Sequence, residues 1–228
     1  MRNYWDIAKR ASDIFEVKKK SITTFTTIST NYKEKKIECK KPFNLNFESK
    51  IKNDYFLNEQ DLKNKLSGPG IYVITYDKKV IYIGSYSSKK SNIIKDRWVK
   101  HISTMTNRGY RLGFNAKSKQ NKIPKNLKVD FDNESFRYGD TGNNTTLERL
   151  QFASINYNKF RNLDDNSLIN KFFFYYKKIK SKPTILEKKL INHFEPICNF
   201  IKKRKYVKNE NIREISINSI KEKIKNMI

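Results

Sequence analysis

Two short strings, Gly70-Ile71-Tyr72 and Tyr82-Ile83-Gly84, bracket the segment of this chain whose fold is most constrained. The residues between them are β-branched and aromatic, apart from the polar Asp77-Lys78 break. Runs of this kind favour strands, and two of them joined by a polar pair favour a hairpin, although Asp-Lys is not the ideal turn pair. We therefore predict two antiparallel strands, with Tyr72 and Tyr82 near opposite ends of the pair.

The two strings resemble the signature of the GIY-YIG nucleases, which are named after this pair of tripeptides. The family's other motif positions follow in order: an arginine and a histidine one helical turn apart, a glutamate on a second helix, then a proline and an asparagine. The matching residues here are Arg97, His101, Glu187, Pro196 and Asn199. The resemblance spans residues 68–199, in which residues 110–172 have no counterpart in the minimal family domain.

The resemblance implies an α+β fold: a small GIY-YIG-type core with a three-stranded antiparallel sheet flanked by helices, carrying a large insertion and additions at both ends. The apolar run Phe172–Tyr176 is the best candidate for the third strand. We expect an N-terminal arm over residues 1–65 that contacts DNA or dimerises, a catalytic domain over 66–200 with its insertion at 110–172, and a basic extension over 201–228.

The spacing of apolar residues and the positions of helix-capping residues and prolines predict the smaller elements. Helical spacing predicts a helix within residues 1–20, a short one ending at Leu66, and one whose apolar stripe includes Ile94 and Trp98. A strand is expected over residues 129–138, and a capping box at Thr145 indicates the next helix start. Pro183 is expected to start the helix that carries Glu187, and residues 217–227 form a weakly amphipathic helix.

The chain is strongly basic, with 49 Lys and Arg against 23 Asp and Glu and a formal charge of +26. Such a field attracts polyanions, nucleic acid first, although an AT-rich coding bias would also raise the lysine content. No long apolar run, signal peptide or lipidation motif is visible. The two cysteines, Cys39 and Cys198, are isolated, which argues against a zinc site or a disulfide framework and favours a reduced, cytoplasmic protein.

Acidic residues are scarce around the motifs, since the predicted hairpin contains only Asp77. A two-metal site needs several converging carboxylates, so the composition favours one metal ion held by Glu187, waters and the phosphate. Mg²⁺ suits so sparse an oxygen site, and Mn²⁺ is the expected substitute. The alternative is that Glu187 only caps its helix, because Thr184-Ile185-Leu186-Glu187 is also a capping-box pattern.

The resemblance assigns roles to the remaining motif residues. Tyr72 is the expected general base, despite a reference pKa of about 10, and Tyr82 positions water or phosphate. Arg97 clamps the scissile phosphate, and His101 donates to it or orients Tyr72. Asn199 ties the segment after the glutamate helix to the site. The alternatives are ordinary ones: core aromatics for the tyrosines, a surface cation for Arg97 and a surface hydrogen-bonding group for His101.

Within this family we expect a type II restriction endonuclease that cuts double-stranded DNA at a specific sequence. The extra mass lies inside the domain, where insertions can read base edges, and cysteines for zinc fingers are lacking. The expected DNA-contacting residues are Arg108, Arg111, Lys117, Lys119 and Asn121. A homodimer or higher oligomer on a palindromic site and a cognate methyltransferase would be its partners. A homing endonuclease and a non-catalytic DNA-binding protein are the alternatives.

Overall fold

The computed structural model describes residues 4–18, 24–30, 33–39, 48–51, 66–106, 112–114, 136–137, 143–156, 159–160, 163–180, 182–201 and 214–228. The chain divides into two compact units, each built from separate stretches of sequence. Unit 1 comprises Met1–Glu16, Lys50–Val99 and Asn166–Ile228, and unit 2 comprises Val17–Ser49 and Lys100–Asp165. The described residues contain both helices and antiparallel strands, which confirms the α+β class.

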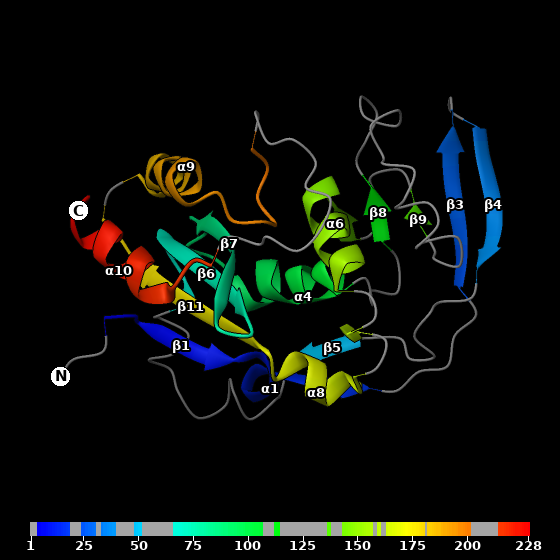
Figure 1. The fold of residues 1–228 in the computed structure, drawn as a ribbon, viewed down its shortest axis with the longest axis horizontal. Coiled ribbons are helices and arrows are strands. Elements are labelled where there is room, and N and C mark those ends of the chain that lie inside the picture. The colour runs from blue at the N-terminus through cyan, green and yellow to red at the C-terminus, as the bar shows by residue number, and fades with distance from the viewer. Residues whose placement is uncertain are drawn as a thin grey trace. The chain divides into compact units, whose positions relative to one another are not determined.

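Unit 1 is organised around an antiparallel sheet of four strands in the order β1-β11-β6-β7 (Figure 1). These strands are β1 (Ile7–Arg10), β6 (Gly70–Tyr76), β7 (Lys79–Tyr86) and β11 (Phe172–Lys178). The predicted third strand is confirmed, because β11 pairs with β6 along its whole length. The prediction of three strands is wrong, however, because β1 adds a fourth on the outer side of β11.

The predicted hairpin is β6 and β7, joined by Asp77 and Lys78. Both turn residues have positive φ values of 46° and 66°, the backbone pattern of a type I′ turn. Asp77 is also tied to the sheet, since its amide donates to the Lys171 carbonyl and its carboxylate accepts from the Lys171 ammonium. These contacts help a residue pair without glycine to hold the turn.

The N-terminal helix predicted from apolar spacing is wrong. The segment instead forms β1, the four-residue helix α1 (Ala11–Ile14) and β2 (Phe15–Lys18), which pairs with β5 (Glu48–Ile51). A strand is favoured here because β11 would otherwise expose an unpaired edge. Asp6 secures the pairing: its amide donates to the Tyr176 carbonyl, and its carboxylate accepts from the Lys178 amide at 2.7 Å.

Two helices cover one face of this sheet, α9 (Pro183–Phe194) and α10 (Ile217–Lys225) (Figure 1). As predicted, α9 starts with Pro183 at its first position and turns its apolar side chains to the core. The resulting cluster contains residues from β6, β7 and both helices, including Ile71, Val73, Ile83, Leu186, Leu190, Ile220 and Ile224. Ser216 caps α10 by accepting from the Ser219 amide at 3.1 Å.

The opposite face of the sheet is aromatic. Trp98, in the π-helical segment η1 (Ile94–Trp98), stacks on Phe174 of β11 with ring centroids 4.5 Å apart. Phe15 meets the same Phe174 ring edge-on at 6.0 Å. η1 runs directly into α4 (Val99–Met105). The predicted apolar stripe of this helical stretch is confirmed, because Ile94, Trp98, Ile102 and Met105 are all buried.

Unit 2 contains a second sheet, in the order β10-β8-β9-β3-β4. Its strands are β3 (Thr24–Thr30), β4 (Lys33–Cys39), β8 (Leu112–Phe114), β9 (Phe136–Arg137) and β10 (Asn143–Thr145). Strands β3 and β9 pair in parallel, so the N-terminal arm and the insertion contribute to one sheet.

The described part of the insertion includes the helices α6 (Leu147–Ile155) and α8 (Asp165–Ile169). Helix α6 starts one residue later than predicted, with Thr146 rather than Thr145 accepting from the Arg149 amide at 3.4 Å. Of the strand expected over residues 129–138, only β9 falls within the described residues, and the helix expected before Leu66 lies outside them. No helix among the described residues is long and apolar enough to cross a membrane.

Candidate active site on strand β7

The two motif tyrosines lie side by side on the aromatic face of the sheet. Tyr72 of β6 pairs with Gly84 of β7, and Ile74 pairs with Tyr82, so the tyrosines are diagonal neighbours on one face. The prediction that they lie near opposite ends of the paired strands is wrong. Their ring centroids are 5.8 Å apart, with the ring planes inclined at 35°. Tyr72 is almost fully buried, at 2% exposure, whereas Tyr82 is half-buried.

Gly84 provides the space that the Tyr72 ring occupies. A Cβ added at Gly84 would lie only 2.5 Å from the Tyr72 hydroxyl oxygen. Gly70 has the same relation to Tyr176, since a Cβ there would lie 2.5 Å from that ring. Both glycines of the two tripeptides are therefore needed for ring packing, and Gly84 lets the Tyr72 hydroxyl reach across β7 towards the edge of the sheet.

Asn199 is fixed to the edge of β7 by two buried hydrogen bonds. Its side chain accepts from the Ile83 amide at 2.9 Å and donates to the Ile83 carbonyl at 2.7 Å. The neighbouring Cys198 amide donates to the Ile81 carbonyl at 2.9 Å. The segment after α9 thus runs along β7 almost as a further strand would, and it covers backbone groups that an edge strand exposes.

Glu187 also contacts β7, through Ser85, which lies two residues after Ile83 on the strand. The Ser85 hydroxyl donates to the Glu187 carboxylate at 2.5 Å, and both groups are partly buried. The helix-capping alternative for Glu187 does not hold in this structure. Helix α9 has Lys182 at its N-cap and no side-chain cap, so Glu187 lies beyond the first turn.

Arg97 is anchored near the same strand by its neighbour Asp96. The Asp96 carboxylate accepts from the Tyr86 hydroxyl at 2.6 Å and from the Ser91 hydroxyl at 2.8 Å. Burial, followed by the hydrogen bond to Asp96, raises the pKa of Tyr86, so its phenol stays neutral and keeps donating. Arg97 itself is exposed, and it makes no hydrogen bond or ion pair among the described residues.

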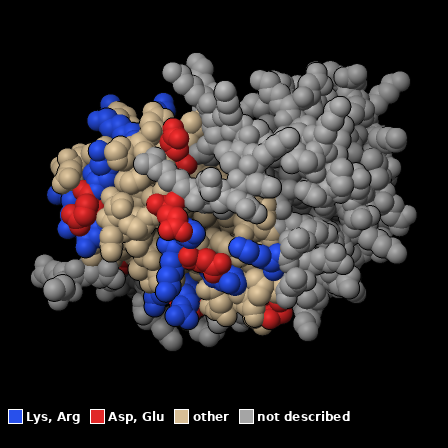
Figure 2. Space-filling view, in the orientation of Figure 1, with Lys and Arg blue, Asp and Glu red and all other residues tan. Residues whose placement is uncertain are grey.

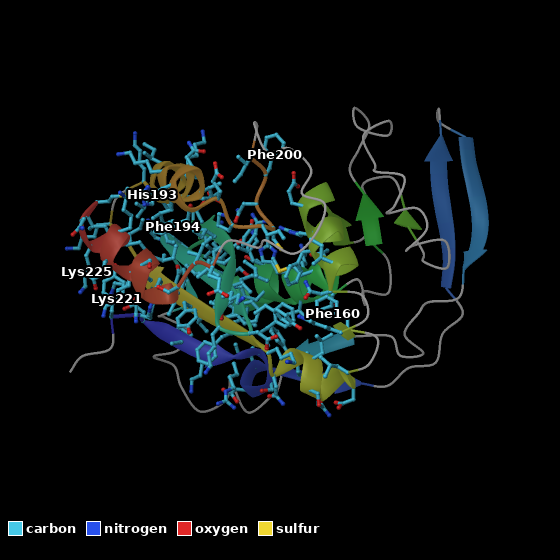
Figure 3. All side chains as sticks on the ribbon, viewed as in Figure 1. Phe160, His193, Phe194, Phe200, Lys221 and Lys225 are labelled. Carbon is cyan, nitrogen blue, oxygen red and sulfur yellow. The ribbon has the colours of Figure 1, made fainter. Side chains whose placement is uncertain are left out.

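The two histidines lie on different helices, and only one of them is buried. His101 belongs to unit 2 and is buried at 4% exposure on α4, where its carbonyl accepts from the Thr104 hydroxyl. Arg97, four residues earlier in η1, is exposed. His193 is exposed on α9, edge-on to Phe194 at 4.7 Å (Figure 3).

The described carboxylates offer a sparse ligand set for a metal ion. No group of three or more His, Cys, Asp or Glu side chains comes together among the described residues. Asp96 has both oxygens occupied by hydroxyl donors, whereas Ser85 engages only Oε2 of Glu187. No Lys or Arg of the described residues forms an ion pair with Glu187. Glu187 therefore fits a cation that keeps most of its water ligands.

Basic side chains are spread over the described part of the surface. In the view of Figure 2 lysines and arginines occupy several areas, with acidic residues between them, rather than one continuous patch. The predicted DNA-contacting residues lie outside the described residues; they are Arg108, Arg111, Lys117, Lys119 and Asn121.

Comparison with known protein families, curated proteins and solved structures finds no match for this chain. The candidate site is therefore identified from the contacts that its residues make. Each residue from Tyr82 to Tyr86 of β7 has a contact at the candidate site. Tyr82 and Gly84 contact Tyr72, Ile83 bonds to Asn199, and Ser85 bonds to Glu187. Tyr86 bonds to Asp96, the neighbour of Arg97. Sequence reasoning missed the supporting residues Ser85, Tyr86 and Asp96. The presence of hydroxyls just after Tyr82-Ile83-Gly84 was the available signal, but nothing in the sequence identified their partners.

Proposed function

We propose that this chain is a metal-dependent endonuclease that hydrolyses phosphodiesters in double-stranded DNA. The observation that carries the proposal is the convergence of Tyr72, Tyr82, Glu187 and Asn199 on β7, with Arg97 anchored through its neighbour Asp96 to the same strand. These residues are far apart in sequence and follow the order of the GIY-YIG motifs. Tyr72, Glu187 and Asn199 come from three separate segments of the chain, and each of them contacts β7.

The faces of β7 on which these side chains lie suggest a role for each of them in the reaction. Successive residues of a strand point to opposite faces, so Tyr72 crosses β7 at Gly84 on one face while Glu187 meets Ser85 on the other. β7 is the outer strand of the sheet, and groups from both of its faces would have to reach the same phosphate at the end of β7 that carries Gly84 and Ser85. Tyr72, as its phenolate, accepts the proton of the attacking water and becomes a neutral phenol, and Tyr82 positions water or phosphate.

The charged groups act on the phosphate itself. Bound Mg²⁺, held by Glu187, would supply a polarised water and relieve charge on the phosphoryl oxygens. Arg97, which has no partner among the described residues, is free to place its planar guanidinium against the scissile phosphate. Asn199 keeps β7 and the end of α9 in register, so that Glu187 stays opposite Ser85.

The net charge of the chain and the presence of unit 2 favour DNA as the substrate. The formal charge of +26 favours a polyanion. Unit 2, which joins the N-terminal arm and the insertion in one sheet, gives this protein a second body that can read base edges. We therefore favour a type II restriction endonuclease with a cognate methyltransferase, ahead of a homing endonuclease. A DNA-binding protein without catalysis is the remaining alternative.

A plasmid digest tests the proposal. Purified protein is incubated with unmethylated supercoiled plasmid in Mg²⁺, in Mn²⁺ and in excess EDTA. We expect nicked and linear products with either metal ion, none with EDTA, and discrete fragments that recur between preparations. Binding of plasmid without cleavage in any metal ion would favour the non-catalytic alternative, and cleavage unaffected by EDTA would refute the metal-dependent mechanism.

A further inference from the structure

We propose that Ser85 is a positioning residue that holds the Glu187 carboxylate ready for a divalent cation without neutralising it. The inference rests on the proposed function and extends it to a residue outside the motif set. Its basis is the 2.5 Å hydrogen bond from the Ser85 hydroxyl to Oε2 of Glu187, which links positions separated by 102 residues.

The position of the Ser85 donor is set by the sheet. Ser85 pairs with Ile71 in the β6–β7 ladder, immediately after Gly84. Its side chain projects from the face that packs on α9, where Leu186 and Leu190 bury against Ile71 and Ile83. A short hydroxyl on a rigid strand has little freedom to move, and an O–H···O⁻ bond of this length lies in the charge-assisted range.

The chemistry of the donor matters as much as its position. Glu187 is followed on α9 by Lys188 and Lys189, in a chain of 49 basic residues, yet the described residues form no ion pair with it. Elsewhere in unit 1 carboxylates do pair with lysine, as Asp77 does with Lys171 at 3.1 Å. A lysine would cancel the charge that a cation needs, whereas a neutral hydroxyl fixes one oxygen and leaves the negative charge in place.

The arrangement also leaves Glu187 a free lone-pair direction. Ser85 is the single hydrogen-bond donor to this carboxylate among the described residues, and it engages Oε2. Asp96 offers the contrast, because Tyr86 and Ser91 occupy both of its oxygens. Ser85 therefore orients Glu187 for a ligand, whereas the Asp96 bonds serve to anchor the segment that bears Arg97.

Three substitutions separate orientation from simple packing. Ser85→Ala removes the donor, Ser85→Thr retains it, and Ser85→Lys replaces it with a cation. Removing a residue that orients a metal ligand typically weakens metal binding by about 10- to 100-fold. We expect Ser85→Ala to weaken Mn²⁺ binding within that range, Ser85→Thr to remain near wild type, and Ser85→Lys to show no binding. Ser87→Ala, an exposed serine two residues further on, is the matched control.

The experiment is calorimetric titration of each full-length variant with Mn²⁺ alone, accompanied by thermal unfolding and by plasmid cleavage across a range of Mg²⁺ concentrations. The proposal predicts that excess Mg²⁺ restores cleavage by Ser85→Ala to near the wild-type rate. Wild-type Mn²⁺ affinity in Ser85→Ala would overturn it, as would a cleavage loss that no Mg²⁺ concentration relieves. If the wild-type chain neither binds Mn²⁺ nor cleaves plasmid, the proposed function itself fails, and the role of Ser85 with it.

Discussion

Replacing Gly84 with alanine should damage catalysis far more than the added methyl group suggests. The new Cβ would lie 2.5 Å from the Tyr72 hydroxyl oxygen and 2.6 Å from its Cε1, whereas ordinary contact begins at 3.4 Å. The ring must therefore withdraw by about 1 Å, because dispersion contacts turn repulsive at such short separations. Overpacking of this kind costs about 1–3 kcal/mol of folding free energy. A displacement of about 1 Å at a reacting group can lower the rate by about 100-fold.

Gly70→Ala is the matched control, because it overpacks the same sheet but presses on Tyr176 and the Lys177 carbonyl. Urea denaturation should show that both variants are less stable than wild type. Cleavage measured at saturating Mg²⁺, below both unfolding midpoints, should fall by about 100-fold only for Gly84→Ala. A Gly84→Ala enzyme that is destabilised yet cuts at the wild-type rate would refute the claim that the position of the Tyr72 hydroxyl matters.

Three further outcomes are expected. Tyr72→Phe should abolish cleavage at every pH with little change in melting temperature, while Tyr82→Phe should keep more residual activity; the reverse order would exchange their roles. Arg97→Ala should lower the single-turnover rate by orders of magnitude with modest loss of DNA affinity, and equal losses in both would make it an ordinary phosphate contact. Burial raises the pKa of Tyr4 to about 12 and also raises the pKa of Tyr176. Their neutral forms therefore support the folded state fully below about pH 10, and the chain should lose stability as pH rises above that value; unchanged urea midpoints between pH 9 and pH 11 would contradict this.

Elements defined by local pattern were predictable from the sequence. The β6–β7 hairpin follows from β-branched runs around a polar pair, and α9 follows from Pro183 and its apolar spacing. In both cases the residues that decide the structure are neighbours in the chain.

The N-terminal segment shows where that reasoning fails. Trp5, Ile7, Ala11 and Ile14 are buried, as their apolar spacing implied, but they do not form the predicted helix. The element type is set by β11, whose outer edge pairs with Ile7–Arg10 from across the chain. A pairing between distant segments leaves no periodic signal in either of them, so tertiary contact overrides the local pattern.

The same distinction applies to the candidate site. The motif residues could be named from a family resemblance, but helix capping was an alternative role for Glu187, which only the position of the α9 N-cap at Lys182 removes. The supporting bonds from Ser85 and Tyr86 join segments whose spacing carries no pattern. Only the fold shows which hydroxyl meets which carboxylate.

The most direct test of the account is single-turnover plasmid cleavage by Glu187→Gln, with DNA affinity measured in parallel. This change keeps the size of the side chain and removes the charge that would hold Mg²⁺. The account predicts no nicked or linear product, with DNA affinity unchanged or slightly tighter because one negative charge near the phosphate is lost. Cleavage by Glu187→Gln in Mg²⁺ at close to the wild-type rate would contradict the assignment of Glu187 as the metal ligand and, with it, the proposed active site on β7.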